Sequence, residues 1–481
     1  MSIVLDDTLQ YPNGDEWFSP DHPFPEYPFK HLSKQKNPVY AAVRSCLAGA
    51  ELDQGNFGSP EWNPLGAYIS PGQNVFVLCN FVQHRWKGGM DAFHAKCTHA
   101  SVIRALIDYI LIALKDRGKV HFGNAPIQSC EWEKVVQDTG AARVAEFYRQ
   151  FGTSRVPVAL TDLRQHIIRH RIIGSFEPRL HRSDTEMCVE VDLGQHSLLE
   201  DLYQSDGEPE FRVLDYDHRR TQRCHGRGRH LYLIHRHILD ADVLVSIPKL
   251  KTHEKVGMTC GIKGCVGAVG HKDCLAHHRR GSPRSGGDEY PDSLSFLAPI
   301  SRLHDLVYTL PTGSIQWSLH LMHQWCRKIV RRFTGALSGS WPGNDTCWRM
   351  ALDLARIVEY ASRDGHLDGK RKRVHLCLTD GIVAGEGNGP LSPRPVRLGY
   401  INFADNVVAG DYANCIAMGI PPSNLPMVRE AFRLNVYRIA PNSPSDVICR
   451  VNERRLNLDE LSQVFGRKFR LPREWEKRRC S

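Results

Sequence analysis

A run of cations and glycines follows an apolar segment in the middle of the chain. Residues 243–247 are rich in β-branched side chains and predict a buried strand, which Pro248 ends because it has no N–H to donate. Six basic side chains follow with glycines spaced among them: Lys249, Lys251, His253, Lys255, Lys263 and His271. Glycine lets backbone N–H groups approach an anion, and lysine supplies point charges. We predict that Lys251, His253 and Lys263 act on a phosphate or carboxylate and that Lys249 helps to bind it. The alternative is a glycine-rich surface loop with solvated lysines.

A second polar concentration follows an apolar segment at residues 374–378. Residues 379–390 hold Asp380, Glu386 and Asn388 among four glycines. A carboxylate at the end of a strand suits a divalent cation or a general base, so Asp380 is predicted to be catalytic and Asn388 to contact the substrate. The predicted ligands of a divalent metal ion are Asp380, Glu386, Asp411 and His277. The alternative is a turn in which Asp380 and Asn388 bond their own backbone.

Further polar residues lie near the ends of two predicted helices. Asp345 or Thr346 suits the N-cap of a helix predicted over 350–358, and Arg349 is predicted to contact the substrate. Asp411 falls in the first turn of a helix predicted over 406–419, which Gly419 ends. There it either favours the helix dipole or points into the site.

The elements that position these groups predict an α/β fold. Residues 74–78 and 119–122 read as buried strands, and apolar residues between 102 and 114 recur at helical spacing. Strand, helix and strand at this distance form a βαβ unit and hence a parallel sheet. We expect a mostly parallel sheet with helices on both faces. Loops at the carboxyl ends of its strands gather at one edge, where Asn80 and Asn124 are predicted substrate contacts.

The remaining segments surround this core. We predict an irregular N-terminal arm (1–65), two parts of the α/β core (66–278 and 346–425), an insertion (279–345) and a C-terminal extension with a basic tail (426–481). Within the insertion, an amphipathic basic helix is predicted from Trp317, Leu321, Trp325, Ile329, Phe333, Arg327, Lys328, Arg331 and Arg332. Such a helix packs on its own protein, on a partner, or on a membrane surface as a peripheral contact.

Composition excludes several classes of protein. The 481 residues are 41% hydrophobic and 24% charged, as in ordinary globular proteins, and the net charge of +9 permits an anionic ligand without requiring one. We expect no secretion signal, because the N-terminal residues lack a basic region followed by an apolar core, and no membrane-spanning segment, because no uncharged apolar run approaches about 20 residues. Fifteen cysteines without a CxxC pair indicate neither a disulfide framework nor a zinc ribbon, so a cytoplasmic location is expected.

Five ordered motifs resemble the domain-of-unknown-function family 362 over about residues 70–420. They are PGQNVFVLCN, HFGNAPIQ, VSIPKLKTHEKVGMTCGIKGCVG, LTDGIVAGEGNGP and VVAGDYANCIAMGI. The resemblance implies an α/β fold and no settled activity. Some members carry a ferredoxin-like module with cysteine quartets, which this chain lacks, so an iron–sulfur cluster is not expected. The chain also departs from the family by having Cys79-Asn80 where a lysine is usual and Asn124 where an aspartate is usual.

The segment from Lys255 to His278 is also similar, more weakly, to part of the nickel-pincer lactate racemases. That similarity implies a metal or pincer cofactor held by Lys263, His253 and His277. The neighbouring Cys260, Cys265, Cys274 and His277 match no standard zinc spacing, and buried cysteines fit better.

Three functions remain open at this point. The first is an enzyme of unspecified reaction class that acts on an anionic small molecule, with a divalent metal ion as an optional cofactor. The second is a binding or scaffold protein that uses the basic helix at 317–333. The third is a nucleic-acid binder that uses Arg/His runs at 164–171 and 218–223, although no known nucleic-acid motif is present, and solvated faces explain such runs better. The first is preferred.

Overall fold

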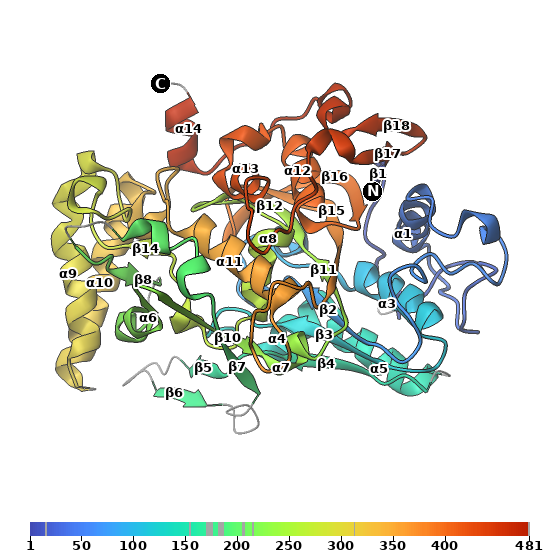
Figure 1. The fold of residues 1–481 in the computed structure, drawn as a ribbon, viewed down its shortest axis with the longest axis horizontal. Coiled ribbons are helices and arrows are strands. Elements are labelled where there is room, and N and C mark those ends of the chain that lie inside the picture. The colour runs from blue at the N-terminus through green and yellow to red at the C-terminus, as the bar shows by residue number, and fades with distance from the viewer. Residues whose placement is uncertain are drawn as a thin grey trace.

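A computed structural model describes residues 1–14, 17–152, 155–169, 177–180, 187–203, 207–213, 216–311 and 313–479. Its centre is an eleven-stranded sheet in the order β18-β17-β1-β16-β15-β11-β2-β3-β4, in which β12 also pairs with β15, and β13 pairs with β12 (Figure 1). The core strands are β2 (Asn74–Cys79), β3 (Lys119–Asn124), β4 (Val158–Asp162), β11 (Val243–Ile247), β15 (Val374–Asn388) and β16 (Ser392–Ala404). Of these, β15, β11, β2, β3 and β4 run parallel, and β16 is antiparallel to β15. The α/β prediction is confirmed.

Alternate side chains of the central strands enter two different cores. Val75 and Val77 of β2 face one core, whereas Phe76 and Leu78 face the other. The first core is covered by α1 (Pro38–Gly49), α3 (Ala100–Leu114), α4 (Trp132–Thr139) and α5 (Ala141–Phe151). The second is covered by α7 (Arg236–Leu239), α8 (Gly261–Gly264), α11 (Cys347–Tyr360) and α13 (Pro426–Ala431), with the start of α12 (Val407–Ala417). Because a parallel strand is buried on both faces, its sequence is a continuous apolar run.

Local conformation sets several element boundaries. His99 caps α3 by accepting the N–H of Ser101, and Lys115 ends the helix in the left-handed conformation. Residues 131–151 contain two helices separated by Gly140, whose φ of 82° breaks the helical path. Residues 229–239 form β10 (Arg229–His235), which is followed directly by the short α7.

The two glycine-rich loops of the sequence are largely strands. Residues after Pro248 form β12 (Lys249–His253), which pairs with β13 (Gly257–Thr259) and with β15. The predicted loop at 379–390 is a continuation of β15 to Asn388, paired with β16. Asp380 is therefore held inside the sheet instead of at the end of a strand.

The chain ends complete the sheet. Residues 1–65 were predicted to be irregular, yet they supply β1 (Ser2–Leu5) and α1, and β1 pairs with β16 and with β17 (Ile448–Val451). The C-terminal extension adds β17, β18 (Arg454–Asn457) and α14 (Arg473–Arg479). The insertion contains α9 (Ala298–Thr309) and α10 (Ser314–Phe333), which pack together at one side of the molecule, far from α1 (Figure 1). The predicted domain boundaries themselves stay predictions.

Smaller elements lie around the central sheet. They are α2 (Met90–His94), β5 (His166–Arg169), β6 (Glu177–Leu180), β7 (Cys188–Asp192), β8 (Phe211–Arg212), α6 (His218–Cys224), β9 (His225–Gly226) and β14 (His278–Arg279). Residues 170–171, at the end of the basic run 164–171, lie outside the described residues. None of the helices in the described part of the chain combines the length and apolarity needed to cross a bilayer.

Candidate functional site

A cavity of about 300 Å³ opens at the carboxyl edge of the central strands. Asn80 follows β2, Asn124 ends β3, and residues 253–277 follow β12; all three segments line the cavity. This is the edge at which parallel α/β sheets bind ligands, as predicted. The cavity wall is rich in basic side chains: Lys255, Lys263, Lys272, Arg327, Arg331, His253, His277 and His320. Among the described lining residues, Glu254 is the one acid, and burial raises the pKa of its carboxyl.

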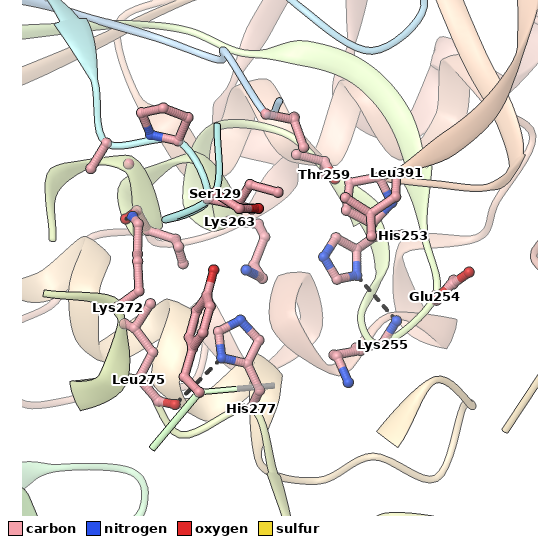
Figure 2. A pocket seen from close by; sticks show the side chains of 18 of the residues that line it. Ser129, His253, Glu254, Lys255, Thr259, Lys263, Lys272, Leu275, His277 and Leu391 are labelled. Carbon is pink, nitrogen blue, oxygen red and sulfur yellow. Dashed lines mark hydrogen bonds between the residues drawn. The ribbon is translucent and has the colours of Figure 1, made fainter. Parts of the chain in front are cut away.

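Lys263 is the central cation of this cavity. Its side chain is 6% exposed and reaches into the space between His253 and His277 (Figure 2). Its ammonium has no hydrogen-bond or ion-pair partner among the described residues. Burial lowers the pKa of Lys263, and no carboxylate opposes this shift. The structure therefore presents a buried basic side chain without a counter-charge.

Lys263 is positioned by contacts at the start of α8. The Asp411 carboxylate accepts the backbone N–H of Gly261 at 2.8 Å and of Ile262 at 2.9 Å. A Cβ on Gly261 would lie 2.4 Å from Val407 Cγ2, so glycine permits this close approach of α8 to α12. Asp411 lies beyond the first turn of α12, contrary to the prediction, and it does not line the cavity. Burial raises the pKa of its carboxyl to about 7.

The two histidines beside Lys263 have complementary hydrogen-bonding roles. His253 Nδ1 accepts the backbone N–H of Lys255 at 3.1 Å, which assigns the ring proton to Nε2. His277 Nδ1 donates to the Leu275 carbonyl at 3.4 Å, which leaves its Nε2 as an acceptor. Burial and the neighbouring ammonium of Lys263 lower the pKa of both imidazoles well below the usual value. Both rings are therefore neutral near pH 7, one offering a proton and the other able to take one.

Two more lysines lie beside Lys263, His253 and His277 in the cavity wall. The Lys272 ammonium donates to the Val266 carbonyl at 2.6 Å, and the Lys255 ammonium donates to the Ser338 carbonyl. Burial lowers the pKa of Lys255 to about 8. Two lining oxygens, Asn124 Oδ1 and Thr259 Oγ1, are buried and lack partners. Buried polar atoms are normally satisfied, so these oxygens are open positions for a polar ligand.

One wall of the cavity comes from the insertion, which the sequence did not connect to the site. His320, Gln324, Arg327 and Arg331 of α10 line it. Their spacing of four, three and four residues places them on one helical stripe, so a polar periodicity was present in the sequence. Lys255, Lys272, Ser129 and Thr259 were also not predicted as site residues. Nothing in the order of the chain shows that 320–331 packs beside 253–277.

Some predicted site residues lie just behind the cavity. Lys251 does not line it, but its ammonium donates to Oδ1 of Asn80, which does, and to the Lys96 carbonyl at 2.6 Å. Burial lowers the pKa of Lys251 to about 7.

Lys249 and Asp380 lie away from the cavity and form a buried ion pair. Lys249 Nζ is 2.9 Å from Asp380 Oδ1, and both side chains are fully buried. Tyr11 and the His99 N–H donate to Asp380 at 2.5 and 3.0 Å, so this aspartate is saturated.

The carboxylates predicted to bind a metal ion are not brought together. Glu386 accepts the Arg470 N–H, Asn388 accepts the Arg473 N–H, and neither lines the cavity. Arg349 also lies outside the cavity, where it pairs with Asp201 and Asp345.

Among the described residues, one group has the geometry for a metal ion: His218, His304 and Asp305. Its Asp305 is held by Arg212 at 2.9 Å through both oxygens, so we assign it to anchoring α9.

Residues of the two basic runs are engaged within the protein. Arg164 is buried, pairs with Asp162 at 2.6 Å and donates to the Cys130 carbonyl. Arg219 pairs with Asp217 at 2.8 Å. Guanidinium groups that are already paired offer little to a phosphate backbone.

Residues 198–415 match a family model whose description is domain of unknown function (DUF362). The resemblance to this family is confirmed. The match begins later than the predicted residue 70 and leaves the segments that carry Asn80 and Asn124 outside. The DUF362 segment contains Lys263, His253, His277 and Asp411, and the insertion helix α10 lies within it. It therefore includes most of the cavity wall.

Comparison with other proteins adds nothing more specific than DUF362. No curated protein matches the chain. A crystal structure of a protein from Thermotoga maritima is similar at 12% sequence identity with a TM-score of 0.29. The similarity covers 71% of this chain and 53% of that one, so the chain spans about half the length of this relative.

Proposed function

We propose that the cavity binds an anionic small molecule bearing phosphate or carboxylate groups and that Lys263, His253 and His277 perform acid–base chemistry on it. The observation that carries the proposal is the unpaired Lys263 ammonium. Burying a charge without a partner costs several kcal/mol, on the order of 3–5, and is tolerated where function requires it. A ligand anion would supply the missing counter-charge.

The surrounding groups favour the same class of ligand. Lys255 and Lys272 add positive charge on either side of Lys263, and Arg331 adds more from α10. Charge in a low-dielectric cleft attracts anions more strongly than the same charge on a surface. The unsatisfied Asn124 Oδ1 and Thr259 Oγ1 would accept hydrogen bonds from hydroxyl groups of the ligand.

The supported chemistry is proton transfer at a carbon or oxygen next to the anionic group. His277 Nε2 is free to take a proton, and His253 Nε2–H can give one, because each tautomer is fixed by a backbone hydrogen bond. The Lys263 ammonium would stabilise negative charge that develops between them. Lys251 acts on this arrangement through Asn80 and is a positioning residue.

A metal or pincer cofactor remains an expectation carried by resemblance alone. His253, His277 and Lys263 line the same cavity. Within the described residues, however, no third His, Cys, Asp or Glu joins the two imidazoles in a metal-binding group. The chemistry proposed above therefore uses the side chains themselves.

The test measures thermal unfolding and calorimetric binding with inorganic phosphate, pyrophosphate and citrate. The wild type should be stabilised by about 2.7 kcal/mol at a hundredfold excess over the Kd. Lys263→Met should lose at least tenfold in affinity while its unliganded form is as stable as the wild type or more stable, because a buried charge is removed. Lys134→Met, at an exposed position on α4, is the control. Equal stabilisation of all three proteins, or of none, would refute the proposal.

A further inference from the structure

The outer face of α10 is an exposed apolar surface. Phe333, Ile315 and Trp325 are 73%, 70% and 69% exposed. The apolar face, as the name is used below, consists of Ile315, Leu321, Met322, Trp325, Ile329 and Phe333. Isolated apolar side chains on a surface are ordinary, but a contiguous group of large ones marks an interaction site.

This face is opposite to the side of α10 that packs on the protein. His323 and Arg327 point inward and are buried, whereas the apolar face recurs at intervals of three, four and seven residues on the other side. The helix is amphipathic, but its apolar side is turned outward. In Figure 1, α10 lies at the edge of the molecule, beside α9 and away from the central sheet.

The charges on α10 are all of one sign. The helix carries Arg327, Lys328, Arg331 and Arg332 and contains no aspartate or glutamate. Lys328, Arg331 and Arg332 are exposed. The side chains of Lys328 and Arg332 have no ion pair or hydrogen bond among the described residues. The surface next to the apolar face is therefore positively charged and uncompensated.

We propose that α10 binds the surface of an anionic lipid bilayer, lying in the plane of the membrane with its apolar face among the acyl chains. A helix with Trp, Phe and Ile on one side and Lys and Arg along its flank has the composition of an interfacial helix. Tryptophan suits the headgroup region because its ring is amphipathic. The proposal does not rest on the proposed function of the cavity.

Charge decides between a bilayer and a second copy of the chain. Two copies meeting through this face would bring the cations of both helices together without acids on α10 to compensate them. An anionic bilayer provides the complementary charge, and its deformable apolar interior can accept the outward apolar face of α10 without a preformed groove. Each cation close to such a surface contributes roughly fivefold to binding, so the two exposed cations outside the cavity, Lys328 and Arg332, give about a 25-fold preference for anionic over neutral vesicles.

The experiment is co-sedimentation of the full chain with vesicles of phosphatidylcholine alone and of phosphatidylcholine with 30% phosphatidylserine. We expect binding to the anionic vesicles that weakens with added salt. Trp325→Ser with Phe333→Ser should abolish it, and Lys328→Glu with Arg332→Glu should weaken it at least tenfold. The matched control is Val436→Ser with Ile448→Ser, since these side chains are 45% and 46% exposed elsewhere.

Several outcomes would overturn the proposal. They are equal binding of the control and α10 variants, equal binding to both vesicle types, no binding by the wild type, and a concentration-dependent dimer that the α10 variants abolish. None of the four substituted α10 residues lines the cavity, so their response to phosphate should stay that of the wild type. That readout confirms that the variants are folded and separates this proposal from the function proposed for the cavity.

Discussion

The Asp411 carboxylate accepts the backbone N–H of Gly261 at 2.8 Å. Asp411 lies on α12 and Gly261 begins α8, two residues before Lys263. The contact therefore joins a helix behind the sheet to the turn that directs Lys263 into the cavity. A carboxylate that sequence reasoning placed on a metal ion instead holds the main-chain framework of the cationic site.

Asp411→Asn should impair both stability and anion binding. The amide keeps the size of the side chain but turns one acceptor into a donor facing a backbone N–H, at a cost of about 1–3 kcal/mol. Urea unfolding and phosphate titration measure the two effects, and Asp7→Asn, at an exposed position, is the control. Unchanged stability in Asp411→Asn would show that the carboxylate is not a structural acceptor.

Asp380→Asn should destabilise the protein by about 3–5 kcal/mol, because Lys249 would remain buried without its counter-charge. The double variant Asp380→Asn, Lys249→Met should recover part of this loss, since it removes the charge that lost its partner. Denaturant unfolding of both single variants and the double variant gives the coupling energy. If the two losses simply add, the pair does not act as a buried ion pair.

Stability should rise between about pH 7.5 and 8.5. Burial lowers the pKa of Lys251 to about 7 and of Lys255 to about 8, so in this range the folded state holds fewer protons than the unfolded state. The unfavourable buried charges disappear as the pH rises, and the gain is about 1–2 kcal/mol. Above about pH 9 the sign reverses, because burial raises the pKa of thiols such as that of Cys46 to about 12.

The variant that checks this pH dependence is Lys251→Met. It should lose about 1 kcal/mol of the gain between pH 7.5 and 8.5, whatever its absolute stability. Urea unfolding at three pH values measures the slope. A slope identical to that of the wild type would assign the titration to other groups.

Two basic residues of α10 allow a direct contact with the bound anion to be distinguished from general attraction by the helix. Arg331 lines it, whereas Lys328 is exposed and does not. Arg331→Gln should weaken phosphate or pyrophosphate binding about fivefold to tenfold, since a charge close to the anion is lost. Lys328→Gln should leave that affinity within twofold of the wild type in isothermal titration calorimetry. Equal effects of both substitutions would indicate general attraction by the helix instead of a direct contact.

The sequence by itself determined the parallel core and the edge at which the cavity lies. Apolar runs such as 74–78 and 243–247 are short and rich in β-branched residues, so they predict strands buried on two faces, and the loops that follow parallel strands share one edge. His253, Lys263 and His277 could be placed at that edge because they follow one such strand closely.

Only the tertiary structure decided which groups meet there. Pairing with β16 extends β15 through the predicted loop, so Asp380 is withdrawn into an ion pair with Lys249. Packing of the insertion brings Arg331 to the cavity and leaves Trp325 exposed, although the two residues lie on one helix. Such outcomes depend on contacts between segments far apart in the chain, and local periodicity contains no information about them.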